Sequence, residues 1–268
     1  MPAEHYLEQS GEYMRFSLWV GAVILLGWQH ALAEVPSELV GLDQLYPSLD
    51  ALYIDLHKNP ELSLHEEKTA SKMASHLRNL GFEVTQHVGG HGVVAVLRNG
   101  PGPTVLVRTD MDALPIKEMT GLAYASTIVF KSDAGDSVSV THACGHDIHM
   151  ASWVGAATLL ARAKNSWHGT LVFVGQPAEE MLQGAKAMVD DGLLTRFPRP
   201  DYAIAIHDTN LLPAGQIGII GGPAFAASNA VDINFLREGR PRGPAPPHDR
   251  SSVDRCAHRR NAADDCRA

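Results

Sequence analysis

The spacing of apolar residues between Leu42 and Phe235 alternates between the period of a helix and the short apolar runs of strands. Helical spacing is found in Leu42–His57, Glu66–Leu80, Asp147–Ala163 and Gly184–Leu194. Short runs rich in β-branched residues predict strands at Phe82–Val88, Val93–Arg98, Thr104–Thr109, Gly169–Val174, Tyr202–Ile206, Gln216–Ile220 and Ala230–Phe235. This alternation predicts an α/β fold with three layers, in which helices cover both faces of a mostly parallel sheet.

Proline and glycine residues predict where these helices break or end. We expect Pro47 to interrupt the first helix, because proline lacks the amide hydrogen that a helix interior needs. Asn59 and Pro60 then end that helix. Gly81 follows the second helix at the position of a C-cap.

Polar residues gather where the predicted strands end and where one helix begins. Directly after apolar strands come Asp110, Asp112, Glu179, Glu180 and His207. Cys144, His146 and Asp147 stand just before the apolar part of the third helix, Met150–Ala161. Because open α/β sheets bind ligands outside the carboxyl ends of their strands, we expect these side chains to converge.

Thiolate, imidazole and carboxylate groups together are typical ligands of a divalent metal. Their softness favours Zn²⁺, Mn²⁺ or Co²⁺ over Ca²⁺ or Mg²⁺. We predict that the metal ligands are Cys144, His146, Glu180 and His207. Glu179 is placed to act as general base, since a metal lowers the pKa of bound water from ~15.7 to about 7. Asp112 is a candidate to orient a ligand histidine.

Other interpretations compete with the metal site. Taken singly, Cys144 is typical of an isolated buried cysteine, and Asp110 and Asp112 are typical of a polar turn after a strand. A structural or loop role is at least as well supported for His57, His65, His142 and His149. A cysteine hydrolase built on Cys144 and His146 would leave Glu179, Glu180 and His207 without a role.

Charge and cysteine content narrow the functional classes. The net charge of −8 over 268 residues argues against nucleic acid as a partner. Only three cysteines are present, and Cys256 and Cys266 lie close to the C-terminus, so we expect no disulfide framework and interpret Cys144 as a lone thiol.

The N-terminal segment, residues 1–33, has features of a secretory signal. Arg15 precedes the apolar run Phe16–Trp28, and an Ala-Leu-Ala cleavage pattern stands before Glu34. The run is short for a membrane span, so we expect cleavage, no stable span afterwards, and a secreted or periplasmic mature chain. Met14 makes a better start for such a signal than Met1, because acidic residues fill the first positions.

Several segments of the chain resemble a known enzyme family. The matching segments are Asp55–Ser63, Arg108–Ile116, His142–Met150, Gly175–Glu180, Ala185–Leu193 and Ala205–Asp208. In order and spacing they resemble, over Leu42–Phe235, the metal-dependent amidohydrolases that include hippurate hydrolase, N-acyl-amino-acid hydrolases and auxin–amino acid conjugate hydrolases, relatives of carboxypeptidase G and aminoacylase.

The resemblance implies a zinc-peptidase-like fold and hydrolysis of the amide bond in small N-acyl or N-aroyl amino acids. It also implies that Cys144, His146, Glu180 and His207 hold two divalent ions and that Glu179 is the base. Asp208 stands where many relatives carry an apolar or small residue.

The composition changes abruptly after Leu236. Residues 237–268 contain eight of the 22 Lys and Arg residues, all arginine, and few aliphatic residues. A one-base shift of the codons for Arg237–Pro247 is compatible with the family's Gly-x-Gly-Gly-His-Gly segment, which favours a frameshift near Asn234–Leu236. We therefore expect a partial catalytic domain over residues 34–236, followed by a disordered tail.

Such a change would remove parts that the resemblance implies. These are a histidine that helps bind the developing oxyanion, a further ligand histidine, and an inserted domain through which relatives dimerise. Loss of an oxyanion donor costs about 10²–10³ in rate, so we expect this chain to be weakly active or inactive. The alternative is a non-catalytic fragment that only binds metal or an acyl-amino acid.

Overall fold

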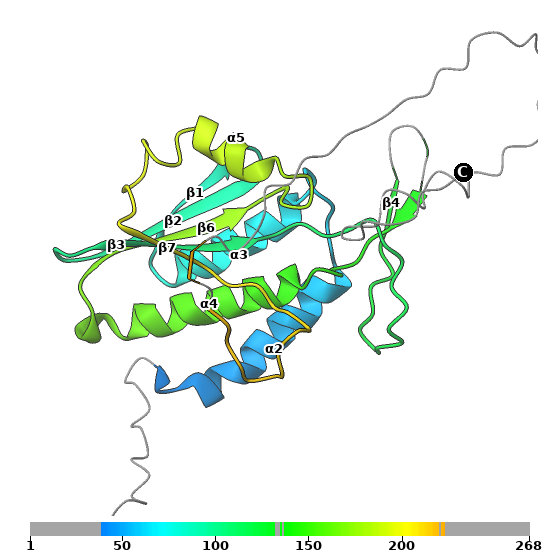
Figure 1. Cartoon of the computed structure of the whole chain (residues 1–268), viewed down its shortest axis with the longest axis horizontal. Coiled ribbons are helices and arrows are strands. Elements are labelled where there is room, and N and C mark those ends of the chain that lie inside the picture. Colours follow the sequence, from blue (N-terminus) through cyan, green and yellow to red (C-terminus); the bar gives the residue numbers. More distant parts are fainter. Residues whose placement is uncertain (1–38, 132–134, 136, 220, 223–268) are drawn as a thin grey trace, which may run out of the picture. The chain divides into compact units, whose positions relative to one another are not determined.

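The structure is a computed structural model that describes residues 39–131, 135, 137–219 and 221–222 (Figure 1). The predicted signal segment, the strand predicted at Ala230–Phe235 and the tail from Arg237 lie outside these residues. The chain divides into two compact units, Met1–Leu211 and Leu212–Ala268. All helices and strands of the described residues belong to the first unit, and none of these helices is long and apolar enough to cross a membrane.

A five-stranded sheet forms the centre of the first unit, with the strand order β1-β2-β6-β3-β7. Its strands are β1 (Glu83–Val88), β2 (Gly92–Asn99), β3 (Thr104–Asp110), β6 (Gly169–Gln176) and β7 (Tyr202–Ala205). Strand β3 runs parallel to β6 and β7, whereas β2 runs antiparallel to β1 and β6. The sheet is therefore mixed, because the short connection at Gly89 and Gly90 forces β1 and β2 into a hairpin. A separate hairpin consists of β4 (Val129–Lys131) and β5 (Ser137–Ser139).

Helices cover both faces of this sheet, which confirms the predicted α/β class and its three layers (Figure 1). They are α2 (Leu42–Lys58), α3 (Glu67–Asn79), α4 (His146–Arg162) and α5 (Gly184–Asp190). The larger core joins Leu56, Met73 and Trp153 of α2, α3 and α4 to one face of β2 and β6. On the other face, Met188 of α5 packs against Val94 and Val174. Strand β2 is buried from Gly92 to Leu97, as expected for a strand covered on both faces.

Three local predictions are wrong. Helix α2 continues through Pro47, which lies in its second turn and removes the hydrogen bond that an amide there would donate to the carbonyl of Asp43. Helix α5 ends at Asp190 rather than Leu194, since Gly192 adopts a left-handed conformation with φ of 89°. Gln216–Ile219 form no strand in the described part of the second unit; Gln216 instead closes a turn with Pro213.

The carboxyl ends of the parallel strands lie side by side. Asp110, the last residue of β3, pairs in register with Gln176, the last residue of β6. Arg108 of β3 pairs with Ala205, the last residue of β7. The segments that follow β3, β6 and β7 therefore leave the sheet at one common edge.

Candidate metal centre

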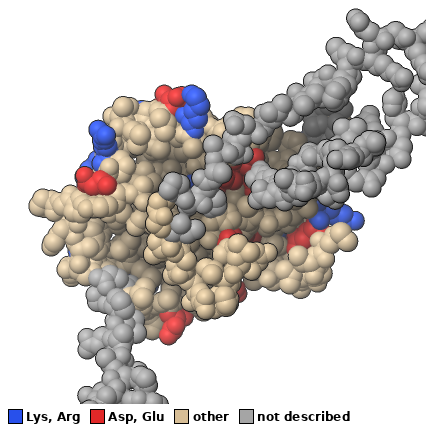
Figure 2. Space-filling view, viewed as in Figure 1, with Lys and Arg blue, Asp and Glu red and all other residues tan. Residues whose placement is uncertain are grey.

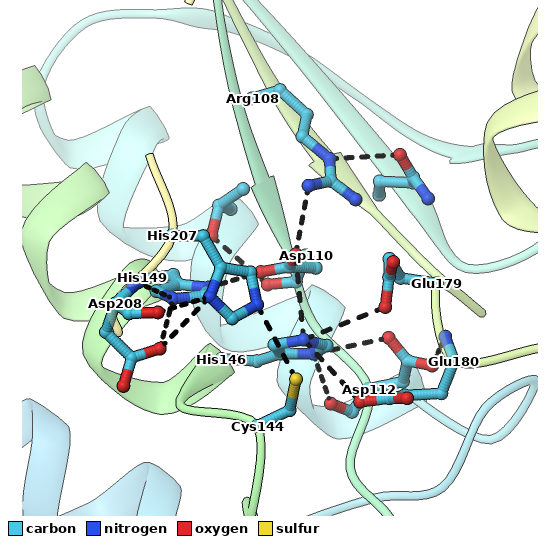
Figure 3. A network of polar contacts seen from close by, with 12 residues as sticks. Arg108, Asp110, Asp112, Cys144, His146, His149, Glu179, Glu180, His207 and Asp208 are labelled. Atoms are coloured by element: carbon cyan, nitrogen blue, oxygen red, sulfur yellow. Dashed lines mark hydrogen bonds and ion pairs between the residues drawn. The ribbon is translucent and has the colours of Figure 1, made fainter. Parts of the chain in front are cut away.

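The predicted site residues lie together at this edge of the sheet (Figure 3). Ligand atoms of Cys144, His146 and His207 lie within 4.8 Å of one another, and so do those of His146, Glu179 and Glu180. His146 belongs to both groups, so it is the centre of the cluster. The structure thus brings together the four predicted metal ligands and the predicted base.

Helix α4 begins at the cluster because Gly145 allows the chain to turn there. Gly145 has φ of 76°, and a Cβ at this position would lie 2.3 Å from Oδ1 of Asp208. Any side chain at Gly145 would therefore displace Asp208 as well as strain the backbone. The turn places His146 in the first position of α4, fully buried.

A main-chain contact fixes the tautomer of His146. Nδ1 of His146 lies 2.7 Å from the main-chain oxygen of Asp112, so Nδ1 carries the hydrogen and donates it. The lone pair of Nε2 then faces acidic groups: Oδ2 of Asp110 at 3.6 Å and Oε1 of Glu180 at 3.8 Å. This is the arrangement of a ligand histidine whose other nitrogen is held by a carbonyl.

His207 has a similar arrangement. Its Nδ1 lies 2.7 Å from the main-chain oxygen of Asp208, and its Nε2 lies 3.5 Å from Sγ of Cys144. Nε2 of His207 therefore faces the Cys144 thiol, and a ring nitrogen of His146 lies within 4.8 Å of both. A hydrogen bond with His146 lowers the pKa of that thiol, but burial and the charge of Glu180 outweigh it and raise the pKa overall.

Buried atoms without partners show that a cation fits this cluster. Nε2 of His146 and Oε1 of Glu180 are buried, and neither has a hydrogen-bond partner in the described part of the chain. Two acceptors that face each other without a hydrogen are unfavourable unless a positive charge lies between them. Burial lowers the pKa of His146, but Asp112, Cys144 and Asp110 raise it to about 11, so the surroundings strongly favour positive charge.

Asp112 contacts the predicted ligand His146 twice: its main-chain oxygen accepts the hydrogen bond from Nδ1, and its carboxylate oxygen Oδ1 lies 3.5 Å from the same nitrogen. The other carboxylate oxygen, Oδ2, accepts hydrogen bonds from Oγ of Ser63 at 2.6 Å and from the amide of Glu180 at 3.0 Å. Burial raises the pKa of Asp112, but hydrogen bonds from His146, Ser63 and the amides of Glu180 and Glu179 lower it overall. Asp112 thus supports the histidine and the glutamate pair at the same time.

The two adjacent glutamates differ in their surroundings. The side chain of Glu180 is 15% exposed and that of Glu179 is 33% exposed, so Glu180 lies deeper in the cluster. Burial and then the charge of Glu180 raise the pKa of Glu179. A partly exposed carboxylate with a raised pKa beside a cation site is well suited to accept a proton.

His149 belongs to a series of polar contacts beside the cluster, although the sequence favoured a structural or loop role for this residue. Nδ1 of His149 lies 2.8 Å from Oδ1 of Asp110, and Nε2 of His149 accepts a hydrogen bond from the amide of Asp208 at 3.0 Å. Asp110 also accepts a hydrogen bond from Arg108 at 2.9 Å. The spacing in the sequence could have predicted that His149 lies near the cluster, because it is three residues after His146 and shares its face of α4.

Other histidines of the motifs lie outside the cluster. His57 is held between Asp147 at 2.6 Å and Glu118 at 3.0 Å. The ring of His65 packs against Phe130 with a centroid distance of 4.6 Å. His142 is buried, and burial lowers its pKa to about 3.

On the face shown in Figure 2, lysine and arginine lie towards the margins of the described surface, whereas acidic side chains also occur near its middle.

Comparison with known proteins gives one family. Residues 106–260 match Peptidase family M20/M25/M40, which is more than half of the 268 residues. The chain is 38% identical to the hippurate hydrolase of Campylobacter jejuni, covering 69% of this chain and 45% of that protein. It is 34% identical to the N-acetyl-L-cysteine deacetylase of Bacillus subtilis, covering 79% and 48%.

A solved structure shares both sequence and fold with this chain. The YXEP protein of Bacillus subtilis, described as a dinuclear metal-binding peptidase of the M20 family, is 34% identical with a TM-score of 0.60. The match covers 68% of this chain and 48% of that one. The chain therefore spans about half the length of the relatives that it matches.

Proposed function

Because this chain belongs to peptidase family M20/M25/M40, we propose that it carries the metal centre of a hydrolase that cleaves the amide bond of N-acyl or N-aroyl amino acids. The observation that carries the proposal is that ligand atoms of Cys144, His146 and His207, and likewise those of His146, Glu179 and Glu180, lie within 4.8 Å of one another. The names of the relatives, a hippurate hydrolase and an N-acetyl-L-cysteine deacetylase, support the substrate class.

The proposed ligands are Cys144, His146, Glu180 and His207, which would hold two divalent ions of the Zn²⁺, Mn²⁺ or Co²⁺ type. Such ions, when bound, polarise the amide carbonyl and make water more acidic.

Proton transfer and the positioning of the ligands would depend on side chains of this chain. Glu179 would accept a proton from the attacking water and return it to the nitrogen of the leaving amino acid. Asp112 would keep Nδ1 of His146 protonated and hold the amide of Glu180. Burial of His146 and Asp110 excludes bulk water from one side of the cluster, so charges there interact more strongly than in solution.

Metal content and turnover, measured on the same samples, test this proposal. The purified chain is loaded with Zn²⁺, Mn²⁺ or Co²⁺, analysed for bound metal, and assayed with N-acetyl and N-benzoyl amino acids. We expect Glu179→Gln to keep the metal and to lose about 10²–10⁴-fold in turnover, as expected for removal of a general base. Glu180→Gln should instead lower the metal content.

The outcomes separate the alternatives. A wild-type chain that binds metal but releases no amino acid supports a non-catalytic binding fragment. Turnover that persists after complete removal of metal, but not after Cys144→Ala, supports a cysteine hydrolase. The second result overturns the proposed reaction, whereas the first limits this chain to metal binding, as the predicted loss of the oxyanion histidine would imply.

A further inference from the structure

Glu66 is a fully buried carboxylate outside the set of residues described above. It stands at the N-cap position of α3, but its side chain makes no hydrogen bond to that helix. Its Oε1 accepts two main-chain hydrogen bonds, from the amide of Leu64 at 3.0 Å and from the amide of Ala178 at 2.7 Å. The second bond joins residues 112 positions apart, so it ties the start of α3 to the segment after β6.

Both amides that Glu66 holds belong to residues with an unfavourable backbone conformation. Leu64 has φ of 68° and Ala178 has φ of 46°, in the left-handed region that residues other than glycine rarely occupy. A residue in this conformation is strained and persists only where its surroundings hold it. Ala178 is fully buried, and its carbonyl accepts bonds from the amides of Gln183 and Gly184, both at 3.2 Å.

The strained residue Ala178 directly precedes the two site glutamates. Asp112 accepts a hydrogen bond from the amide of Glu180, while Glu66 accepts one from the amide of Ala178. Two buried carboxylates therefore hold the backbone on both sides of Glu179. The direction in which Glu179 and Glu180 leave the backbone follows from this turn.

We propose that Glu66 is a positioning residue: its carboxylate holds Ala178 in the left-handed turn that directs Glu179 and Glu180 into the metal centre. The inference rests on the proposed function. Packing alone does not account for Glu66, because its Oε2 is buried without a hydrogen-bond partner in the described part of the chain. An apolar side chain of the same length would avoid that cost but would leave the amide of Ala178 unpaired.

The test compares Co²⁺ binding by the full chain in four forms: wild type, Glu66→Gln, Glu66→Met and the control Glu61→Met. Glu61 also holds α3, through hydrogen bonds at 2.8 Å from the amide and hydroxyl of Thr69, but its side chain makes no bond to the segment after β6. Co²⁺ affinity and the visible spectrum of the bound ion are recorded, with circular dichroism as the measure of folding.

We expect Glu66→Met to weaken Co²⁺ binding at least tenfold and to alter the spectrum. Glu66→Gln keeps an acceptor for Ala178 and should stay within threefold of wild type. Glu61→Met should also stay within threefold, even where its melting temperature falls. If Glu66→Met does not fold, Glu66→Asp takes its place, because its carboxylate is one methylene too short to reach Ala178.

The outcomes distinguish the two proposals. Unchanged affinity and spectrum in Glu66→Met, or in Glu66→Asp where that variant is used, overturn the role of Glu66 and leave the metal centre standing. Equal weakening by Glu61→Met also overturns it, because the effect then belongs to α3 as a whole. A wild-type chain that binds no Co²⁺ overturns the proposed function, and the role of Glu66 with it.

Discussion

Nδ1 of His146 donates a hydrogen bond to the main-chain oxygen of Asp112 across 2.7 Å, and this single contact decides which nitrogen of His146 is free for a metal. A main-chain acceptor cannot be protonated or replaced by substitution, so Nδ1 keeps its hydrogen and Nε2 is the nitrogen left for a metal. The lone pair on Nε2 then points into a cluster of thiol and carboxylate groups.

Replacing Cys144 by serine should remove the sulfur signal from the metal centre. Sγ of Cys144 lies 3.5 Å from Nε2 of His207, so a metal bound by that histidine would also meet the sulfur. We expect Co²⁺ bound to the wild type to show a sulfur-to-cobalt charge-transfer band, and Cys144→Ser to lose it and bind at least tenfold more weakly, since thiolates suit these ions better than hydroxyls. A variant with Cys256→Ser and Cys266→Ser is the matched control and should keep the band.

Metal should stabilise the fold. Nε2 of His146 and Oε1 of Glu180 are buried and have no hydrogen-bond partner in the described part of the chain. The native state without a cation therefore carries an electrostatic cost that a bound metal removes. At a free metal concentration 100 times the dissociation constant, one site adds about 2.7 kcal/mol to the free energy of unfolding. Thermal unfolding with and without a chelator measures this gain, and Glu180→Gln should show a smaller gain. An equal melting temperature in both conditions would contradict the metal site.

The sequence was sufficient to predict the helices and strands of the central sheet and its two covering layers, and the meeting of the main site residues. Glu179, Glu180 and His207 each follow an apolar strand, and parallel strands bring their carboxyl ends to one edge. Both predictions depend on patterns that are local in the chain. The antiparallel direction of β2 relative to β6 could not be predicted in this way. It depends on which strands become neighbours in the sheet, and β6 lies about 70 residues further along the chain.

Contacts made by the main chain could not be predicted in this way. Nothing about Ala178 as a residue type signals a left-handed conformation, since alanine normally prefers a right-handed helix. Its conformation is held by Glu66, at a distance in sequence that no local pattern reports. Asp208 is similar: its main-chain oxygen and amide contact His207 and His149, and its residue type alone reveals neither contact.

The sheet core should depend strongly on Phe173 of β6. This side chain is fully buried, and its ring packs at 5.3 Å from Phe82 and at 5.2 Å from Trp153. We expect Phe173→Ala to lower the free energy of unfolding by about 3–5 kcal/mol, the usual cost of truncating a buried aromatic residue. Met119, which is 88% exposed, provides the control: Met119→Ala should change the free energy by less than about 0.5 kcal/mol. Urea denaturation measures both, and equal effects would contradict this assignment of the core.

A buried group of charges links α2, α4 and the segment that contains Glu118. His57 of α2 lies between Asp147 of α4 and Glu118, and the rings of Tyr53 and Tyr124 pack against it at 5.7 Å and 5.4 Å. Burial lowers the pKa of His57, but the two carboxylates outweigh it and raise the pKa overall. Burial raises the pKa of Glu118, but hydrogen bonds from Thr120, His57 and Ser126 lower it from 4.5 to about 2.

The stabilisation due to Glu118 should therefore be lost in acid. A carboxylate whose pKa is lower in the folded than in the unfolded state contributes fully above its unfolded value of 4.5 and loses that contribution as the pH falls towards 2. At pH 6, where His57 stays protonated in the folded state, we expect Glu118→Gln to lower the free energy of unfolding by about 1.5–3 kcal/mol, the usual contribution of a hydrogen bond to a charged group. The difference from wild type should shrink as the pH falls below 4.5 in urea denaturation, because the carboxyl then takes up a proton in the unfolded state while the folded state keeps it charged down to about pH 2. Glu83→Gln, which removes an exposed carboxylate paired with Arg98, should show a small difference throughout. A difference for Glu118→Gln that stays constant from pH 6 to pH 3.5 would show that Glu118 acts through its shape and not through its charge.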